Sequence, residues 1–437
     1  MSVQRVSLSD AQRDRAIGAL LGTAAGDALG AGGGLGSGMW SGVTARAVAI
    51  AEIASAGADL SGDESLDYIA ERWTWWARTT AAPERTSGSG PLAWIAPAAL
   101  GTLANPGLLN ATVRRIGALT RDDPDTADAC VLWCAAIAHA VHTGGLDVRI
   151  GLLHIDSERR EVWESRLAEA EDGRPSDFDV GSVVGALQAA WFAIVTTPVP
   201  ADDPASGVFS ADHLRLGLDA AVRAGRDAAT VGAVAGSLLG AAYGASALPW
   251  RWRLALKGWP GLNTRGLVHL GERILGGGEP DRSDQGCESR WDSPPPRRHP
   301  HDDGVFLGSA GLLARVPAGV GAVVSLCRVA DGCVPDKVRH LDVRLIDQVG
   351  ANANLDVVLL DTVRAVEGLR AEGATVFLHG LTRDGRTPTV AALYGARRAG
   401  VGVEQALAEV GVKLPDCEPN REFRAALRRL HPGEGQP

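Results

Sequence analysis

The sequence predicts an all-α domain followed by an α/β domain. From Leu8 to about Gly278, small and apolar residues recur at the helical spacing i, i+3, i+4, and no convincing alternating strand interrupts them. After about residue 302, short β-branched runs alternate with helical stretches, a pattern typical of parallel strands joined by helices. All 12 tryptophans lie between Trp40 and Trp291, so the two parts also differ in composition. These observations indicate a two-domain fusion.

The first expected helix begins at a capping Asp10 and runs to about Gly30. It is rich in Gly and Ala, so its backbone can pack closely against a neighbouring helix. Further helices of the same kind are expected at 45–56, 65–78, 125–142, 184–195, 213–224 and 230–244. A segment rich in Gly, Pro, Ser and charge then separates the domains. We place the helical domain at 8–278, the linker at 279–301 and the second domain at 302–432.

The second domain begins with a β-branched run after Gly319. Residues 341–347 alternate in polarity, and 374–380 form an apolar strand that ends in a polar loop. Helices are expected at 355–372, 388–399, 403–410 and 420–430. The order of strand, helix, strand, loop and helix predicts an α/β layout with parallel strands.

Charge and apolar runs limit the classes of function. The chain of 437 residues has a net charge of −9, spread along its length, which argues against a nucleic-acid partner. No apolar run reaches the ~18–20 residues that span a bilayer, and the polar N-terminus does not resemble a signal peptide. Cys130 and Cys134 share a helix face and are expected to be buried, reduced thiols. A cytoplasmic protein with no membrane partner is expected.

Two conspicuous groups of residues are given structural roles. Trp73, Trp75 and Trp76 lie on one expected helix and are predicted to pack in the core rather than to stack on bases. The basic run at 297–301 is predicted to be a solvated part of the linker.

Polar residues stand at the ends of the Gly/Ala-rich helices. Asp27 closes the first helix, and Asp227 and Thr230 open a late one. Asp and Thr at a helix start can cap backbone N–H groups, which is the structural interpretation. The functional interpretation is a polar site where the small-residue helices meet.

Several long stretches of the first domain stand out: RAIGALLGTAAGDALG near the start, APAAL, DACVLWCAAIAHAV, VVGALQAAW and, most strongly, AGRDAATVGAVAGSLLGAAYGASALPWRWR at 224–253. Together they resemble the ADP-ribosylglycohydrolase family of the dinitrogenase-reductase-activating type, and the resemblance covers about 12–278. It implies an all-helical fold that removes ADP-ribose from proteins or small molecules at a site with two magnesium ions, and it assigns Asp27 to substrate binding.

The two metal-binding motifs of that family are incomplete here. The family carries Thr-Asp-Asp-Thr after a Trp, whereas this chain reads SGVT at 41–44. The family's Asp-Thr-Asp-Thr has become DAAT at 227–230, and its Asn-Gly-Ser-Leu-Met-Arg has become SGPLAW at 89–94, which loses an Arg. The remaining candidate metal ligands are Ser41, Thr44, Asp227 and Thr230. One carboxylate cannot offset two Mg²⁺, so one weakly held magnesium is compatible with these residues but a two-metal centre is not expected.

The loop after His379 is a candidate anion site. It follows an expected strand and opens a helix, so backbone N–H groups can face an anion, and Arg386 can bind phosphate through two donors. The sequence HGLTRDGRT at 379–387 resembles the signature loop of dual-specificity, cysteine-based phosphatases, which reads His-Cys, five residues, Arg, then Ser or Thr. This resemblance covers about 305–432.

The resemblance implies roles for four residues of the second domain. Asp347 takes the place of the general acid, and Arg386 and Thr387 are expected to bind the phosphate. The nucleophilic Cys is replaced by Gly380, which has no side chain, so covalent catalysis there is impossible. Asp384 within the loop would repel a phosphate.

Three hypotheses for the function follow. The first is a pseudoenzyme that binds an ADP-ribosylated protein, an ADP-ribose-like small molecule or a phosphate-bearing ligand, or that regulates an active paralogue. The second is an active, divergent hydrolase in which Asp227 serves as base or single-metal ligand for cleaving the glycosidic bond to ADP-ribose. The third is a repurposed enzyme acting on a nucleotide or sugar. The missing groups favour the first, and phosphatase activity is not expected.

Overall fold

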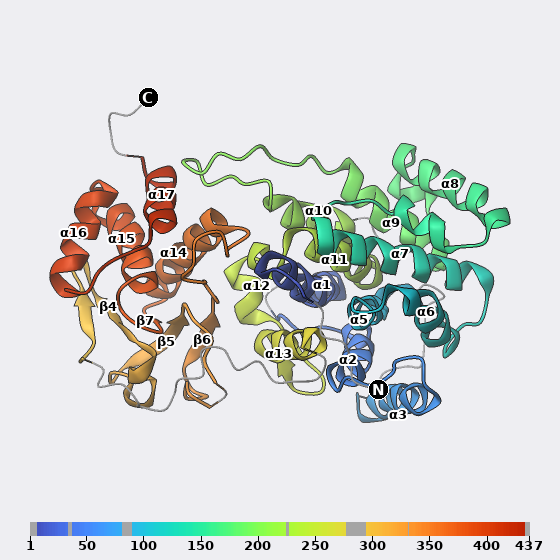
Figure 1. Cartoon of the computed structure of the whole chain (residues 1–437), viewed down its shortest axis with the longest axis horizontal. Coiled ribbons are helices and arrows are strands. Elements are labelled where there is room, and N and C mark those ends of the chain that lie inside the picture. The colour runs from blue at the N-terminus through green and yellow to red at the C-terminus, as the bar shows by residue number, and fades with distance from the viewer. Residues whose placement is uncertain are drawn as a thin grey trace. The chain divides into compact units, whose positions relative to one another are not determined.

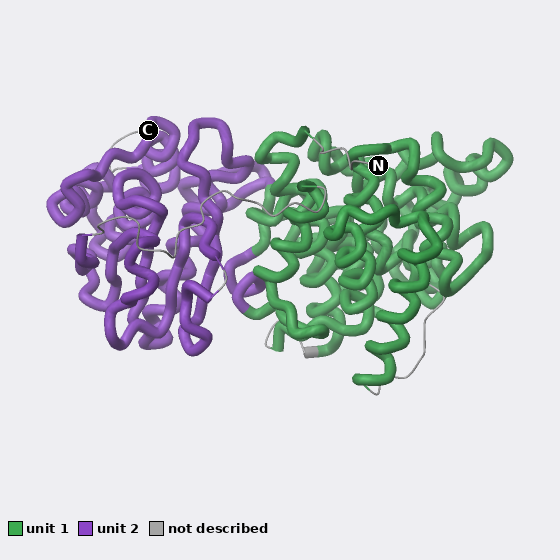
Figure 2. The backbone as a smooth tube through the Cα atoms, turned by 60° about the horizontal axis from the view of Figure 1, so that its bottom comes forward, with its two compact units in different colours: residues 1–199, 211–248, 255–281 green, residues 200–210, 249–254, 282–437 purple. Residues whose placement is uncertain are grey.

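The chain forms two compact units (Figure 2). The computed structural model describes residues 7–33, 37–80, 90–223, 227–276, 294–330 and 332–432. The first unit comprises residues 1–199, 211–248 and 255–281, and the second comprises 200–210, 249–254 and 282–437. Two short segments that the sequence places in the helical domain, 200–210 and 249–254, therefore belong to the second unit. Residues 279–293 of the expected linker lie outside the described residues.

The first unit is helical, as the sequence predicts (Figure 1). Its helices are α1 (Asp10–Ala28), α2 (Gly42–Ser55), α3 (Asp63–Thr80), α4 (Gly90–Trp94), α5 (Ala96–Gly101), α6 (Leu109–Ala118), α7 (Pro124–Thr143), α8 (Ser157–Asp172), α9 (Val183–Thr196), α10 (Asp212–Arg223), α11 (Ala228–Tyr243) and α13 (Thr264–Leu275). A small antiparallel pair, β1 (Lys257–Gly258) and β2 (Leu262–Asn263), accompanies them. Strands of two residues are too short to leave an alternating pattern in the sequence.

Helices α1 and α11 pack with their backbones in contact. Gly22 and Gly26 of α1 face Gly236 and Gly232 of α11, and a Cβ atom on Gly22 would lie 2.8 Å from the carbonyl carbon of Gly236. The close approach expected from the Gly/Ala pattern is thus confirmed. The thiols of Cys130 and Cys134 on α7 are buried and unbridged, as expected.

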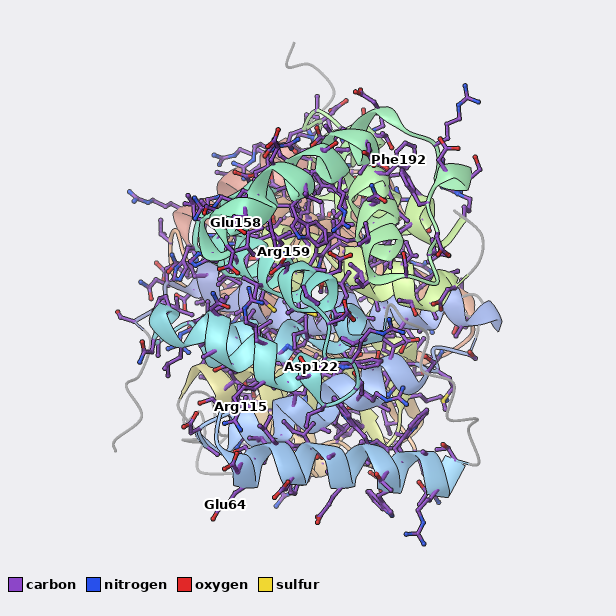
Figure 3. All side chains as sticks on the ribbon, turned by 90° about the vertical axis from the view of Figure 1, so that its right-hand side faces the viewer. Glu64, Arg115, Asp122, Glu158, Arg159 and Phe192 are labelled. Carbon is purple, nitrogen blue, oxygen red and sulfur yellow. The ribbon has the colours of Figure 1, made fainter. Side chains whose placement is uncertain are left out.

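Ion pairs link the outer helices of the first unit. Asp128 of α7 is buried and pairs with Arg114 of α6 and with Arg159 of α8, which is labelled in Figure 3. Arg115 of α6 pairs with Asp63 at the start of α3. Asp128 therefore has cationic partners from two flanking helices, which offset the cost of burying its charge.

The second unit contains a five-stranded sheet in the order β3-β4-β7-β5-β6 (Figure 1). The strands are β3 (Arg297–His299), β4 (Asp302–Ser309), β5 (Val320–Ser325), β6 (Arg339–Asp342) and β7 (Thr375–Gly380). Four of them run parallel, and β3 pairs antiparallel with β4. The helices are α12 (Trp250–Ala255, mostly in this unit), α14 (Leu355–Ala371), α15 (Arg386–Ala399), α16 (Val403–Lys413) and α17 (Arg421–Leu430). This α/β arrangement is the one that the sequence predicts.

Alternate residues of the sheet enter two different cores. Val324 and Leu378 pack with the apolar faces of α14 to α17, whereas Val323 and Phe377 pack with the segment around Leu312. The segments 200–210 and 249–254 contribute Phe209 and Trp250 to the first of these cores. Arg253 of α12 also pairs with Asp361 of α14 at 2.8 Å.

Two features of the second unit differ from the sequence expectation. The alternating run 341–347 is a strand only as far as Asp342, because Arg344 has a φ of 58°, in the left-handed region that interrupts an extended chain. The basic run 297–301 is not solvated linker. It forms β3, and the ring of His299 is buried and donates from Nε2 to the carbonyl of Ala391 at 2.9 Å.

Cys333 of the second unit is disulfide-bonded, so the thiols of this chain are not all in the reduced form that the sequence suggests. Among the described helices, none combines the length and apolar character that crossing a bilayer requires.

Candidate functional site

Asp27, at the end of α1, forms hydrogen bonds with the start of α2. Its carboxylate is fully buried, and Oδ2 accepts hydrogen bonds from the backbone N–H of Ser41 (2.9 Å) and from both the N–H (2.9 Å) and the hydroxyl (2.7 Å) of Thr44. The other oxygen, Oδ1, has no hydrogen-bond partner among the described residues. Burial raises the pKa of Asp27, and the hydrogen bonds from Ser41 and Thr44 oppose that rise. The structure thus brings Asp27, Ser41 and Thr44 together.

Asp227 and Thr230 form a second pair at the start of α11. The hydroxyl of Thr230 donates to Oδ1 of Asp227 at 2.8 Å, and Asp227 has a φ of 54°. Its side chain makes no capping bond to the helix amides, so the capping interpretation does not describe it. A Cβ atom on Gly30 would overlap the backbone of Ala228, which places the residues just after α1 against the start of α11. The ends of the two small-residue helices meet, as predicted.

The position of the first missing acid is covered by a tryptophan. Gly42 is the first residue of α2, and a Cβ atom there would lie 2.5 Å from Cζ2 of Trp76, closer than side chains tolerate. One turn along the same helix face, Cζ of Arg46 lies 4.8 Å from the centroid of the Trp76 ring and 4.9 Å from that of Trp94. Sequence reasoning missed Arg46 and the role of Trp76, although the i, i+4 spacing of Gly42 and Arg46 was there to be read.

Three tryptophans of α3 have different environments. Trp73 and Trp76 are buried, as expected. Trp75 is 47% exposed and packs edge-on against Trp259 at 5.0 Å, so the expected core position is wrong for this residue. Helical periodicity explains the difference, because Trp75 points about 100° away from Trp76.

Among the described residues, the hydroxyl groups of Thr44 and Thr230 are not surrounded by a cluster of carboxylates. No group of three or more His, Cys, Asp or Glu side chains is placed to hold a metal ion in the part of the chain that the structure describes. Thr44 and Thr230 each donate their hydroxyl proton to a carboxylate of this region. Among the sequence-predicted residues, the oxygen ligands available here are therefore the carboxylates of Asp27 and Asp227 and the hydroxyl groups of Ser41, Thr44 and Thr230.

In the second unit, the loop after β7 joins Gly380 to α15. The hydroxyl of Thr387 accepts the N–H of Gly380 at 2.7 Å. A Cβ atom on Gly380 would lie 3.0 Å from the carbonyl oxygen of Thr382 and 3.2 Å from Oγ1 of Thr387, so a side chain there is tight but can be accommodated by small shifts. Oδ1 of Asp384 accepts from the hydroxyl of Thr382 and from the N–H of Gly385.

Arg386 and Asp347 lie on either side of this loop. Nη1 of the buried Arg386 donates to the carbonyl of Leu345 at 3.0 Å. Asp347 lies against the loop, since a Cβ atom on Gly385 would come 2.8 Å from its Cγ. The amide of Asn420 donates to Oδ1 of Asp347 at 2.9 Å, a contact that no sequence signal indicated. The structure therefore brings Asp347, Gly380, Arg386 and Thr387 to one loop.

His379 anchors the base of the loop. It is buried, and burial lowers its pKa to about 4. Its Nε2 is 2.7 Å from the hydroxyl of Ser325, which is also 2.8 Å from Nε2 of His340. A neutral His379 thus joins β7 to the adjacent β5 beneath the loop.

Comparisons with known proteins give one family model and several similar solved structures. A model of the ADP-ribosylglycohydrolase family matches residues 8–283. Among solved structures, an ADP-ribosylglycohydrolase-related protein complex is similar at 24% identity, covering 62% of this chain and 99% of that chain, with a TM-score of 0.46. Human DUSP28 is similar at 26% identity (32% of this chain, 93% of that chain, TM-score 0.29). A human tyrosine phosphatase-like serine/threonine/tyrosine-interacting protein is similar at 18% identity (30% and 93%, TM-score 0.27).

A comparison with curated proteins gives no match. The similarity to dual-specificity phosphatases that the sequence suggests is also found among solved structures. The family model spans more than half of the chain and coincides with the helical region. The chain therefore belongs to the ADP-ribosylglycohydrolase family.

Proposed function

We propose that this chain is a binding protein that has retained both scaffolds and lost both hydrolytic activities. In this proposal the helical unit takes the ADP-ribosyl group of a protein or small molecule. The second unit takes a phosphate-bearing ligand. The observation that carries the proposal is the contact between Gly42 and Trp76, because an aromatic ring stands where the family motif has a carboxylate.

The residues of the helical unit do not fit a pair of magnesium ions. Mg²⁺ takes six oxygen ligands in near-ideal octahedral geometry, and two ions need several carboxylates to balance their charge. Here Gly42, Val43 and Ala229 offer no side-chain oxygen. Oδ2 of Asp27 already accepts three hydrogen bonds. No catalytic step through a metal is therefore proposed.

The loop of the second unit supports anion binding without turnover. Gly380 supplies no thiolate, so no phosphocysteine can form. The N-terminus of α15 follows the loop, and the positive end of a helix favours an anion, although Oδ1 of Asp384 already accepts the N–H of Gly385. The guanidinium of Arg386 is held next to the loop by the carbonyl of Leu345 and offers several N–H donors to an anion.

A divergent hydrolase is the alternative that one observation favours. Asp227 has a positive φ, and non-glycine residues with this backbone are enriched at functional sites. Its bond with Thr230 would orient the carboxylate for work as a general base. This alternative requires turnover that depends on Asp227.

Product release tests the proposal. The full chain would be incubated with ADP-ribosylated arginine and serine peptides and with a chromogenic phosphate ester, each with and without magnesium. We expect no release of ADP-ribose or phosphate above the level of a heat-denatured sample. Release of ADP-ribose that disappears in Asp227→Asn would instead support the divergent hydrolase, and release that survives this substitution would overturn both ideas.

A further inference from the structure

Two arginines of the helical unit lie between pairs of tryptophan rings, but their partners differ. Cζ of Arg72 lies 4.6 Å from the ring centroid of Trp75 and 4.7 Å from that of Trp259. The N–H groups of the Arg72 guanidinium donate to Glu52, with Nη2 2.7 Å from Oε1 and Nε 2.8 Å from Oε2.

Arg46 has no such acceptor. Its guanidinium lies over the rings of Trp76 and Trp94, and its side chain makes no hydrogen bond or ion pair with the described residues. Cation–π contacts cover the faces of the group but leave its N–H donors at the edge without an acceptor among the described residues. Burial also lowers the pKa of Arg46, the direction expected of a cation taken partly out of water without a counter-ion.

A second donor beside Arg46 is also unsatisfied. The indole N–H of Trp94 is buried, with the residue only 2% exposed, and it has no acceptor among the described residues. A buried N–H group without a partner is rare, and its cost is relieved when a ligand supplies an acceptor. Trp94 is also the residue that stands where the family motif carries an Arg.

The charges nearby are compatible with an anion. Arg46 lies one turn inside the N-terminus of α2, where the helix dipole is positive. Glu52 of the same helix forms an ion pair with Arg72. Oδ2 of Asp27 accepts hydrogen bonds from Ser41 and Thr44, which offset part of the charge of this carboxylate.

We propose that Arg46 and the indole N–H of Trp94 form an oxoanion site near the N-terminus of α2 that takes a phosphate or diphosphate group. The site lies where the family motif would place carboxylates for cations, so its charge preference is reversed in this chain. A planar guanidinium matches the paired oxygens of a phosphate and explains why Arg is used here. The inference stands apart from the proposed function, because inorganic diphosphate should bind whether or not ADP-ribose does.

The test is a titration of the full chain with inorganic diphosphate in the absence of divalent ions, followed by calorimetry and tryptophan fluorescence. We expect saturable binding that weakens at least about tenfold in Arg46→Gln, as for loss of a charge-assisted, two-donor contact. Arg72→Gln is the matched control. It removes an arginine from an equivalent aromatic pair and should leave the affinity unchanged. Arg46→Lys keeps the charge and should lose less affinity than Arg46→Gln, which guards against misfolding of the glutamine variant.

The outcomes separate this inference from the proposed function. Equal affinity in Arg46→Gln and the parent chain, or equal losses in Arg46→Gln and Arg72→Gln, would overturn the oxoanion site. A parallel titration with ADP-ribose and with adenosine identifies the source of the anion. If only diphosphate binds through Arg46, the oxoanion site stands and ADP-ribose recognition fails. If ADP-ribose binds and Arg46→Gln changes neither its affinity nor that of diphosphate, ADP-ribose recognition stands and the oxoanion site fails.

Discussion

Replacing Asp27 by asparagine and by alanine separates the roles of its two oxygens. Oδ2 accepts three hydrogen bonds at the start of α2, whereas Oδ1 has no partner in the described structure. Asparagine can place its carbonyl oxygen where Oδ2 lies and its amide nitrogen where Oδ1 lies. Alanine removes the acceptor and leaves the donors of Ser41 and Thr44 unsatisfied.

The expected magnitudes differ clearly. An unsatisfied buried donor costs about 1–3 kcal/mol, so three donors that are partly or fully buried cost about 3–9 kcal/mol. Removal of the buried charge offsets part of this cost, so the free energy of unfolding should fall by about 3–5 kcal/mol in Asp27→Ala. Asp27→Asn should stay within about 1 kcal/mol of the parent, because the hydrogen bonds remain and a buried charge is removed. The pKa of Asp27 is raised in the folded state, so ionised Asp27 costs stability at neutral pH, and that cost disappears as pH falls towards the unfolded value of 3.8.

Urea unfolding of the three proteins at pH 7.5 and pH 5.0 measures these differences. We expect the free energy of unfolding of Asp27→Asn, relative to that of the parent, to be higher at pH 7.5 than at pH 5.0. If the asparagine variant loses as much stability as the alanine variant, the negative charge itself is required and the hydrogen-bond account is refuted. Stabilisation of the parent by millimolar magnesium that is absent in Asp27→Asn would indicate a metal at Oδ1.

Three further outcomes are expected. Gly380→Cys should create slow hydrolysis of a chromogenic phosphate ester, because Asp347 and Arg386 flank the loop. Acidification from pH 7 to pH 5 should destabilise the second unit by about 2 kcal/mol for each of His379 and His299, since burial lowers both pKa values to about 4 and the folded state resists protonation below the ordinary value of 6.5. Gly22→Ala should lower the free energy of unfolding by about 1–3 kcal/mol, because its Cβ would strike α11.

Each of these outcomes has its own control. No activity in a folded Gly380→Cys protein would show that the acid or the loop is wrongly assigned. Circular dichroism at a fixed urea concentration follows the stability of the protein in the acid titration. Unchanged stability at pH 5 would contradict the histidine account. For the helix pair, Gly117→Ala on α6 is the matched control, because nothing lies within 4 Å of the added atom and alanine should gain up to about 1 kcal/mol.

The sequence predicts the scaffolds well because their signals are local or periodic. Gly and Ala at helical spacing indicate that α1 packs closely on another helix, and Gly22 against Gly236 confirms it. The spacing from His379 to Thr387 indicates a strand, a loop and a helix, which are β7 and α15. The loss of a thiol at Gly380 can be read from the sequence alone.

The contacts that define the sites are not local, and the sequence does not reveal them. The ring of Trp76 reaches Gly42 from α3, and the amide of Asn420 reaches Asp347 from a distant loop. No pattern showed that Phe209 and Trp250 pack in the core of the second unit. Sequence periodicity reports which face of an element is apolar, but not which distant side chain will cover it.

Calorimetric titration of ADP-ribose into the full chain, with millimolar magnesium and with a chelator, tests the central claim most directly. The account predicts saturable binding whose affinity is the same under both conditions, with no saturable heat from magnesium alone. Magnesium-dependent binding of ADP-ribose, or two saturable magnesium sites, would contradict the claim that this scaffold has lost its metal chemistry.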